Sequence, residues 1–135
     1  MITLIIGLPN AGKTTYSEKY ENVIHLDEMR KQDRKHAHEN ILKAVKEAKE
    51  DIVIEGVYNG RLGREQIVQA AGDAKKVCIW IDTPIETCLE RNTRGILIID
   101  SLEPPEYSEG WDEIRIVRND KETKKKRGKK NDKQG

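Results

Sequence analysis

A loop at residues 7–15, GLPNAGKTT, carries the residue types that hold the phosphates of a nucleoside triphosphate. Gly7 and Gly12 allow backbone N–H groups to turn toward phosphate oxygens. Lys13 then reaches the β- and γ-phosphates, and the Thr14 hydroxyl takes one coordination position on Mg²⁺. We therefore expect the triphosphate and its Mg²⁺ to be bound by Gly7, Asn10, Ala11, Gly12, Lys13, Thr14 and Thr15.

The segments on either side of the loop meet the structural requirement for such a site, which is a buried strand before it and a helix after it. Residues 2–6, ITLII, are rich in β-branched side chains and predict the strand. Residues 14–20 predict the first turns of the helix, whose N-terminus adds partial positive charge. A strand followed by an ordinary glycine turn is the alternative, but the agreement of strand, loop and helix favours a phosphate loop.

The rest of the chain alternates between strand and helix patterns. Strands are predicted over residues 22–27, 51–55, 75–82 and 112–117, and helices over 35–50, 63–72 and 83–92. Five short strands with helical crossovers predict an α/β fold with a doubly wound parallel sheet. Because ligands bind beyond the carboxyl ends of such strands, this pattern indicates three acidic residues on the same edge as the loop: Asp27, Glu55 and Asp82.

The composition is typical of one domain with a modest core, at 135 residues with 36% hydrophobic and 36% charged. No apolar run approaches membrane-spanning length, and a phosphate loop beginning at residue 7 leaves no room for a signal peptide. Cys78 and Cys88 lack the spacing of metal ligands. We expect them to be reduced core residues in a cytoplasmic protein.

The charges are distributed unevenly, although the formal net charge is only +1. Residues 118–135 contain 9 Lys/Arg and 3 acids, a balance of +6, whereas residues 1–117 contain 16 and 21, a balance of −5. The last fifteen residues include no apolar side chain, so we expect a folded domain over 1–118 and a basic, disordered tail over 119–135. The tail is either a solvated end or an arm that contacts nucleic-acid phosphates.

The order of motifs along residues 1–118 resembles that of the P-loop kinases related to phage-type polynucleotide 5′-kinase. After the phosphate loop come HLDEMR, IVIEG, IDTPIETCLERNTRG and EPPEYSEGWDEI. The resemblance implies a nucleotide-kinase-like P-loop fold and a phosphotransferase that uses ATP and Mg²⁺.

The resemblance also implies roles for four residues. Asp27 and Arg30 match the D-x-x-R motif, in which the aspartate is the general base and the arginine holds substrate phosphate. Arg91 and Arg94 match the arginines of a lid that closes on ATP. Phosphoryl transfer needs such positive charge and an oriented acceptor hydroxyl. The alternatives are a turn aspartate and two arginines that stabilise a helix C-terminus.

Four further polar or aromatic residues could contribute to a site: Glu55, Tyr58, His36 and His38. Glu55 either orders a Mg²⁺-bound water or caps a turn. Tyr58 either stacks on a substrate base or packs in the core. His36 and His38 lie on a predicted helix with spacing that suits a metal poorly, so we expect both to be exposed.

Three functions are compatible with these motifs. The favoured one is transfer of the γ-phosphate of ATP to a hydroxyl of a polynucleotide, either a 5′-hydroxyl end or a hydroxymethylated base. The second is a kinase for a free nucleoside, a nucleotide or another small metabolite. The third is a module that hydrolyses ATP to switch a partner protein. The D-x-x-R motif and the arginines favour a kinase, and the basic tail favours a nucleic-acid partner.

Overall fold

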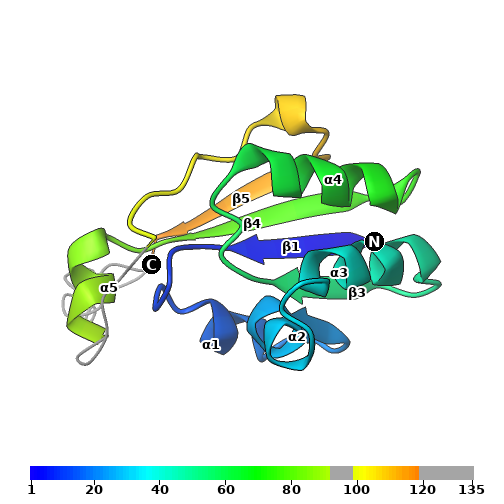
Figure 1. Cartoon of the computed structure of the whole chain (residues 1–135). Helices are drawn as coiled ribbons and strands as arrows, with labels where there is room; N and C mark the ends of the chain where they lie inside the picture. Colours follow the sequence, from blue (N-terminus) through cyan, green and yellow to red (C-terminus); the bar gives the residue numbers. More distant parts are fainter. Residues whose placement is uncertain (92–98, 119–135) are drawn as a thin grey trace.

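The computed structural model describes residues 1–91 and 99–118 (Figure 1). Arg94 and the predicted tail over 119–135 lie outside these residues. In the described part of the chain, no helix is long and apolar enough to cross a membrane.

Five strands form one sheet in the order β2-β3-β1-β4-β5. Their bounds are β1 Ile2–Ile6, β2 Val23–His25, β3 Ile52–Glu55, β4 Lys76–Asp82 and β5 Glu113–Arg118. Every pairing is parallel, which confirms the predicted α/β fold with a doubly wound parallel sheet. Because β1 pairs with β3 on one side and β4 on the other, the strand order reverses at β1. Ligands bind outside the carboxyl ends of strands at such a reversal, and the phosphate loop leaves β1 at this point.

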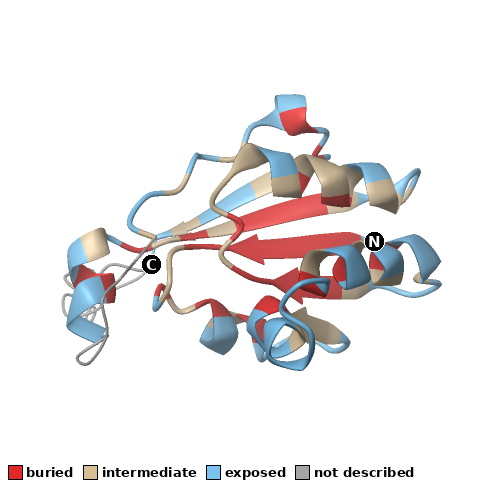
Figure 2. Ribbon diagram, in the orientation of Figure 1, coloured by how far each residue is buried: buried red, intermediate tan, exposed pale blue. Residues whose placement is uncertain are grey.

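Helices cover both faces of the sheet. Leu4 of β1 belongs to a buried apolar cluster with Ile41 and Ile67, whereas its neighbour Ile5 belongs to a second cluster with Cys88. Successive strand side chains point to opposite faces, so the fully buried β1 and the mostly buried β3 and β4 on either side of it (Figure 2) need cover on both faces. The helices are α1 Lys13–Ser17, α2 Leu26–Gln32, α3 Ala37–Glu47, α4 Arg61–Ala71, α5 Ile85–Arg91 and the 3-10 turn η1 Tyr107–Glu109.

The main departure from the predicted elements follows β2. The sequence predicted a strand through residue 27, but β2 ends at His25 and α2 begins at Leu26. Asp27 and Glu28 in the first turn, with basic residues in the last turn, favour a helix because they complement the partial charges of its ends. Asp27 therefore lies on the first turn of a helix and not at the end of a strand.

Candidate active site

The two glycines of the phosphate loop are required for different reasons. Gly12 has φ +107°, in the left-handed region that favours glycine. Gly7 has little space around it, because a Cβ there would lie 3.0 Å from the carbonyl oxygen of Ile81 in β4. The loop thus turns at Gly12 and packs closely against the end of β4 at Gly7.

Lys13 lies inside the loop, with 7% of its surface exposed. Its Nζ donates a hydrogen bond of 2.8 Å to the carbonyl oxygen of Leu8. Burial lowers the pKa of Lys13, and the charges of Glu55 and Asp27 act in the opposite direction. A hydrogen bond from the Lys13 ammonium to an anionic phosphate oxygen would be stronger than its present bond to the neutral Leu8 carbonyl.

Two adjacent cavities open beside the loop, with volumes of about 790 Å³ and about 630 Å³. Both are within the range of ligand sites in proteins. The larger one is lined by phosphate-loop residues and Arg91, and the smaller one extends toward His25 and Arg34. The two cavities share four lining residues: Thr14, Asp27, Arg30 and Glu55. Two ligands, one in each cavity, would therefore meet at these four residues, for which the sequence predicts catalytic or binding roles.

The residues predicted to bind the triphosphate divide into two groups in the structure. Five of them line the larger cavity: Asn10, Gly12, Lys13, Thr14 and Thr15. Gly7 and Ala11 are fully or nearly fully buried behind the loop. The following helix α1 has only five residues, shorter than predicted. The N–H groups of the loop and the Lys13 charge are therefore the main attraction for an anion.

Glu55 ends β3 as predicted, and only 6% of its surface is exposed. Its Oε1 lies 2.7 Å from Nδ1 of His25 and accepts a 3.4 Å hydrogen bond from the Thr14 hydroxyl. A hydroxyl and a carboxylate side by side fit Mg²⁺, which prefers oxygen ligands and is commonly completed by substrate phosphates and water. The described residues contain no group of three or more His, Cys, Asp or Glu that could hold a metal ion.

Asp27 and Arg30 lie one helical turn apart on α2, and both line both cavities. The aspartate and the arginine of the D-x-x-R motif therefore lie beside the same space. Between them, Glu28 forms an exposed ion pair of 3.3 Å with Lys31. On α2, the acid and the base that line both cavities are therefore Asp27 and Arg30.

Arg91 is the last residue of α5, and its Nη1 donates a 3.0 Å hydrogen bond to the carbonyl oxygen of Asn10. It also lines the larger cavity. Arg91 thus does more than stabilise the C-terminus of α5, because it also contacts the phosphate loop. The second predicted lid arginine, Arg94, lies outside the described residues.

Tyr58 corrects one expectation, because base stacking needs an exposed ring. Only 8% of the residue is exposed, and the ring packs in the core cluster with α3 and α4. Its hydroxyl lies 3.2 Å from Nδ1 of His38, and burial raises the pKa of Tyr58. The other ring nitrogen of His38 lies 2.7 Å from Oε1 of Gln66. Because both ring nitrogens have partners, His38 is half-buried, and the expectation that it is exposed was wrong. His36 is exposed as predicted.

Two contacts near the site were not predicted from the sequence. Asp82 ends β4 as expected, but its carboxylate accepts a 2.8 Å hydrogen bond from Arg118, so it has a partner outside the cavities. Thr83, the next residue, donates a hydrogen bond of 2.7 Å to the carbonyl oxygen of Ala11 in the phosphate loop. A lone threonine after a strand gives no sequence signal for this contact.

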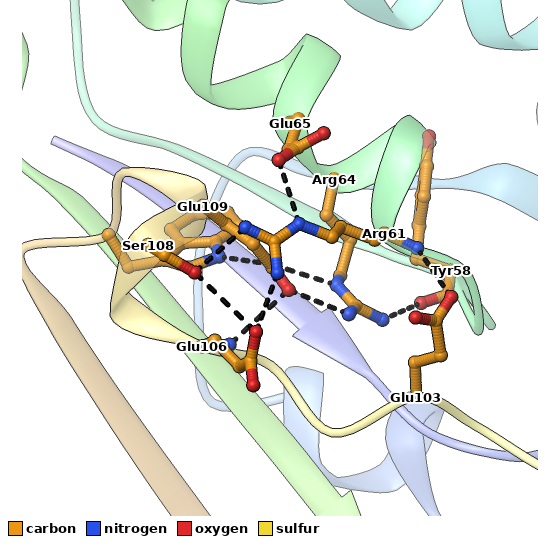
Figure 3. Close-up of polar contacts among 9 residues, drawn as sticks. Tyr58, Arg61, Arg64, Glu65, Glu103, Glu106, Ser108 and Glu109 are labelled. Atoms are coloured by element: carbon orange, nitrogen blue, oxygen red, sulfur yellow. Dashed lines mark hydrogen bonds and ion pairs between the residues drawn. The ribbon is translucent and has the colours of Figure 1, made fainter.

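A buried ion pair behind the site was also missed. Arg64 of α4 is completely buried and binds both carboxylate oxygens of Glu109, at 3.0 and 2.8 Å (Figure 3). Its Nη1 donates to the carbonyl oxygen of Tyr58 at 2.9 Å. The pair therefore links α4 and η1 to the segment that follows Glu55.

No protein-family model and no curated protein sequence matches the chain significantly. A solved structure, the crystal structure of a gluconokinase from Sinorhizobium meliloti 1021, is similar, with a TM-score of 0.54. The alignment covers 87% of this chain and 81% of that chain, at 18% sequence identity. This chain therefore has a fold similar to that of the gluconokinase. At this identity the likeness establishes the fold alone. The finer resemblance to polynucleotide kinases stays a prediction.

Proposed function

We propose that this protein is an ATP-dependent kinase that phosphorylates a hydroxyl group of a small, negatively charged metabolite. The observation that carries the proposal is the pair of cavities that share Thr14, Asp27, Arg30 and Glu55. The larger cavity contains the phosphate loop and suits ATP, and the smaller one suits the acceptor. The similarity to a gluconokinase, a kinase of a small metabolite, supports this proposal over the polynucleotide acceptor that the sequence favours.

The smaller cavity is lined by three acidic residues, Asp27, Glu28 and Glu55, and three basic ones, Arg30, Lys31 and Arg34. Its two arginines are the feature that supports an anionic acceptor. Arg30 on α2 and Arg34, just beyond the end of α2, both line the cavity, while the nearby Lys31 is paired with Glu28. Among the residues that the structure describes, neither arginine has a carboxylate partner. A guanidinium binds carboxylate and phosphate groups through two parallel hydrogen bonds. An acceptor with a carboxylate or a phosphate would satisfy both arginines.

The proposed transfer uses residues of the shared wall together with Lys13 and Arg91 of the larger cavity. The Asp27 carboxylate accepts the proton of the acceptor hydroxyl, and the oxygen then forms a bond to the γ-phosphorus of ATP. The bond from that phosphorus to the β–γ bridging oxygen breaks, and ADP leaves with the electron pair. Lys13 and Arg91 stabilise the negative charge on the transferred group. Mg²⁺, held through Thr14 and Glu55, supplies further positive charge when it is bound.

An ATP-hydrolysing switch is the alternative without an acceptor. Such a module has no need for a second cavity that contains Asp27 and two arginines without carboxylate partners among the described residues. A nucleic-acid acceptor would instead draw on the predicted basic tail, which lies outside the described residues. The three functions differ in where the γ-phosphate goes.

Transfer of labelled γ-phosphate from ATP in the presence of Mg²⁺ tests the proposal. The acceptors offered in parallel are gluconate and other hydroxy acids, uncharged polyols, nucleosides, nucleoside monophosphates, 5′-hydroxyl oligonucleotides and hydroxymethylated DNA. We expect label in a small acceptor that carries a carboxylate or phosphate, and a weaker signal with Arg34→Ala. Lys35→Ala is the matched control, because Lys35 is exposed and lines neither cavity. Label only in inorganic phosphate would support the switch, and label only in oligonucleotides would support a polynucleotide kinase.

A further inference from the structure

We infer that Thr83 is a positioning residue for the phosphate loop, because its hydroxyl fixes the peptide group between Ala11 and Gly12. The inference rests on the proposed function, in which that loop binds ATP. Thr83 does not line either cavity, so it would act through the loop and not by contact with the nucleotide.

The sheet order places Thr83 behind the loop. β4 pairs directly with β1, with Trp80 opposite Ile6, so residues just beyond both strands lie close together. The surroundings of Gly7 show the same closeness, since a Cβ there would lie only 3.0 Å from the Ile81 carbonyl oxygen. From this position, Oγ1 of Thr83 donates its 2.7 Å hydrogen bond to Ala11. Thr83 is 4% exposed and Ala11 is completely buried, so the bond is shielded from water.

Because the peptide group is planar, the hydrogen bond to the Ala11 carbonyl also sets the direction of the Gly12 N–H. The Ala11 carbonyl and the Gly12 N–H belong to one planar trans peptide group and point in opposite directions. A carbonyl held toward Thr83 therefore directs the Gly12 N–H away from Thr83. Gly12 lines the larger cavity. Its N–H has no hydrogen-bond partner among the described residues, so it is available to a phosphate oxygen.

The neighbouring carbonyl groups of the loop show the same arrangement. The Leu8 carbonyl accepts from the Ala11 N–H at 3.0 Å and from Lys13, and the Asn10 carbonyl accepts from Arg91. A loop that presents N–H groups to an anion must find donors for its carbonyl groups elsewhere. Thr83 and Arg91, on the segment after β4, supply two of these donors. The residue after β4 and the last residue of α5 thus both support the carbonyl groups of the loop.

Substitution of Thr83 by valine tests this role because it keeps the shape of the side chain and removes the donor. We expect Thr83→Val to weaken Mg·ATP binding by about tenfold, which corresponds to one hydrogen bond of roughly average strength. Thr83→Ser keeps the hydroxyl and should bind within about twofold of wild type. Thr87→Val is the matched control, since Thr87 is also a buried threonine and lies one turn further along α5. Isothermal titration calorimetry well below the melting temperature of each variant measures the affinity.

A second measurement separates this inference from the proposed function. The Gly12 amide resonance of the protein without nucleotide should move in Thr83→Val and stay in place in Thr83→Ser and Thr87→Val. If Thr83→Val does not fold, Thr83→Ala removes the same donor and takes its place. Equal Mg·ATP affinity and an unmoved Gly12 resonance in the variant that lacks the hydroxyl would overturn the inference. If the wild type does not bind Mg·ATP, the proposed function fails, and the Gly12 resonance alone decides the role of Thr83.

Discussion

Two charged regions of this molecule differ in whether their charges have partners. Around Arg64 and Glu109, every residue labelled in Figure 3 forms at least one hydrogen bond or ion pair with another. Beside the phosphate loop, Asp27 and Arg30 face cavities. Both regions border the end of β3 and the segment after it, because Arg64 binds the Tyr58 carbonyl and Glu55 lines both cavities.

The difference indicates separate tasks for the two regions. A fully satisfied buried network fixes one arrangement of the chain, because any break leaves an uncompensated charge. Glu109 also accepts from the Trp111 indole at 2.9 Å, and Arg61 adds bonds to Glu106 and Ser108 at the surface. Charges that lack internal partners remain available for ligands. We therefore expect substitutions in the first region to affect stability and those in the second to affect activity.

The largest expected effect is on turnover at Asp27. Asp27→Asn keeps the shape of the side chain but cannot accept the acceptor proton, so phosphoryl transfer should fall by ~10²–10⁴. ATP affinity and melting temperature should change little. Asp33→Asn, the same substitution in the exposed residue at the end of α2, is the control. A parallel loss of ATP affinity, with normal turnover per bound ATP, would instead place Asp27 in the magnesium site.

The next effect is on stability at Glu109. Glu109→Gln leaves the Arg64 guanidinium buried without a counter-charge, which should cost about 3–5 kcal/mol of unfolding free energy. Glu106→Gln removes an exposed ion pair with Arg61 and should cost at most about 1 kcal/mol. Urea titration of both variants measures the difference. Similar losses in the two variants would mean that the buried pair has no special structural role.

A smaller effect is expected in the dependence of stability on pH. Burial by itself raises the pKa of Glu109, but hydrogen bonds from Arg64 and Trp111 outweigh it and hold the pKa below the ordinary value. The unfolded chain therefore binds a proton before the folded chain does. The stabilisation is complete above an unfolded pKa of about 4.3 and is lost as the pH falls through the lower folded pKa. Glu109→Gln should lose less stability than wild type between pH 5 and pH 3, and parallel pH profiles would contradict this.

The sequence predicted what depends on local pattern. The apolar run before Gly7 and the spacing to Lys13 predict the strand and the phosphate loop, and alternating elements predict the parallel sheet. The segment of α2 is short and lacks a clear apolar period, so its helix was missed. Contacts between residues far apart in the chain have no local signal, and Thr83 and Ala11 are separated by 72 positions. The burial of Arg64 depends on Glu109 in the same way, 45 positions away.

The most direct test of the central claim is the melting temperature of wild type and Lys13→Met, each with and without Mg·ATP. Without nucleotide the two should differ little, because methionine keeps the buried stem and the Leu8 carbonyl keeps its bond from the Ala11 N–H. At a nucleotide concentration of about 100 Kd, wild type should gain about 2.7 kcal/mol of stability, and Lys13→Met should gain far less. Equal gains in both proteins, or no gain in wild type, would contradict ATP binding at the phosphate loop.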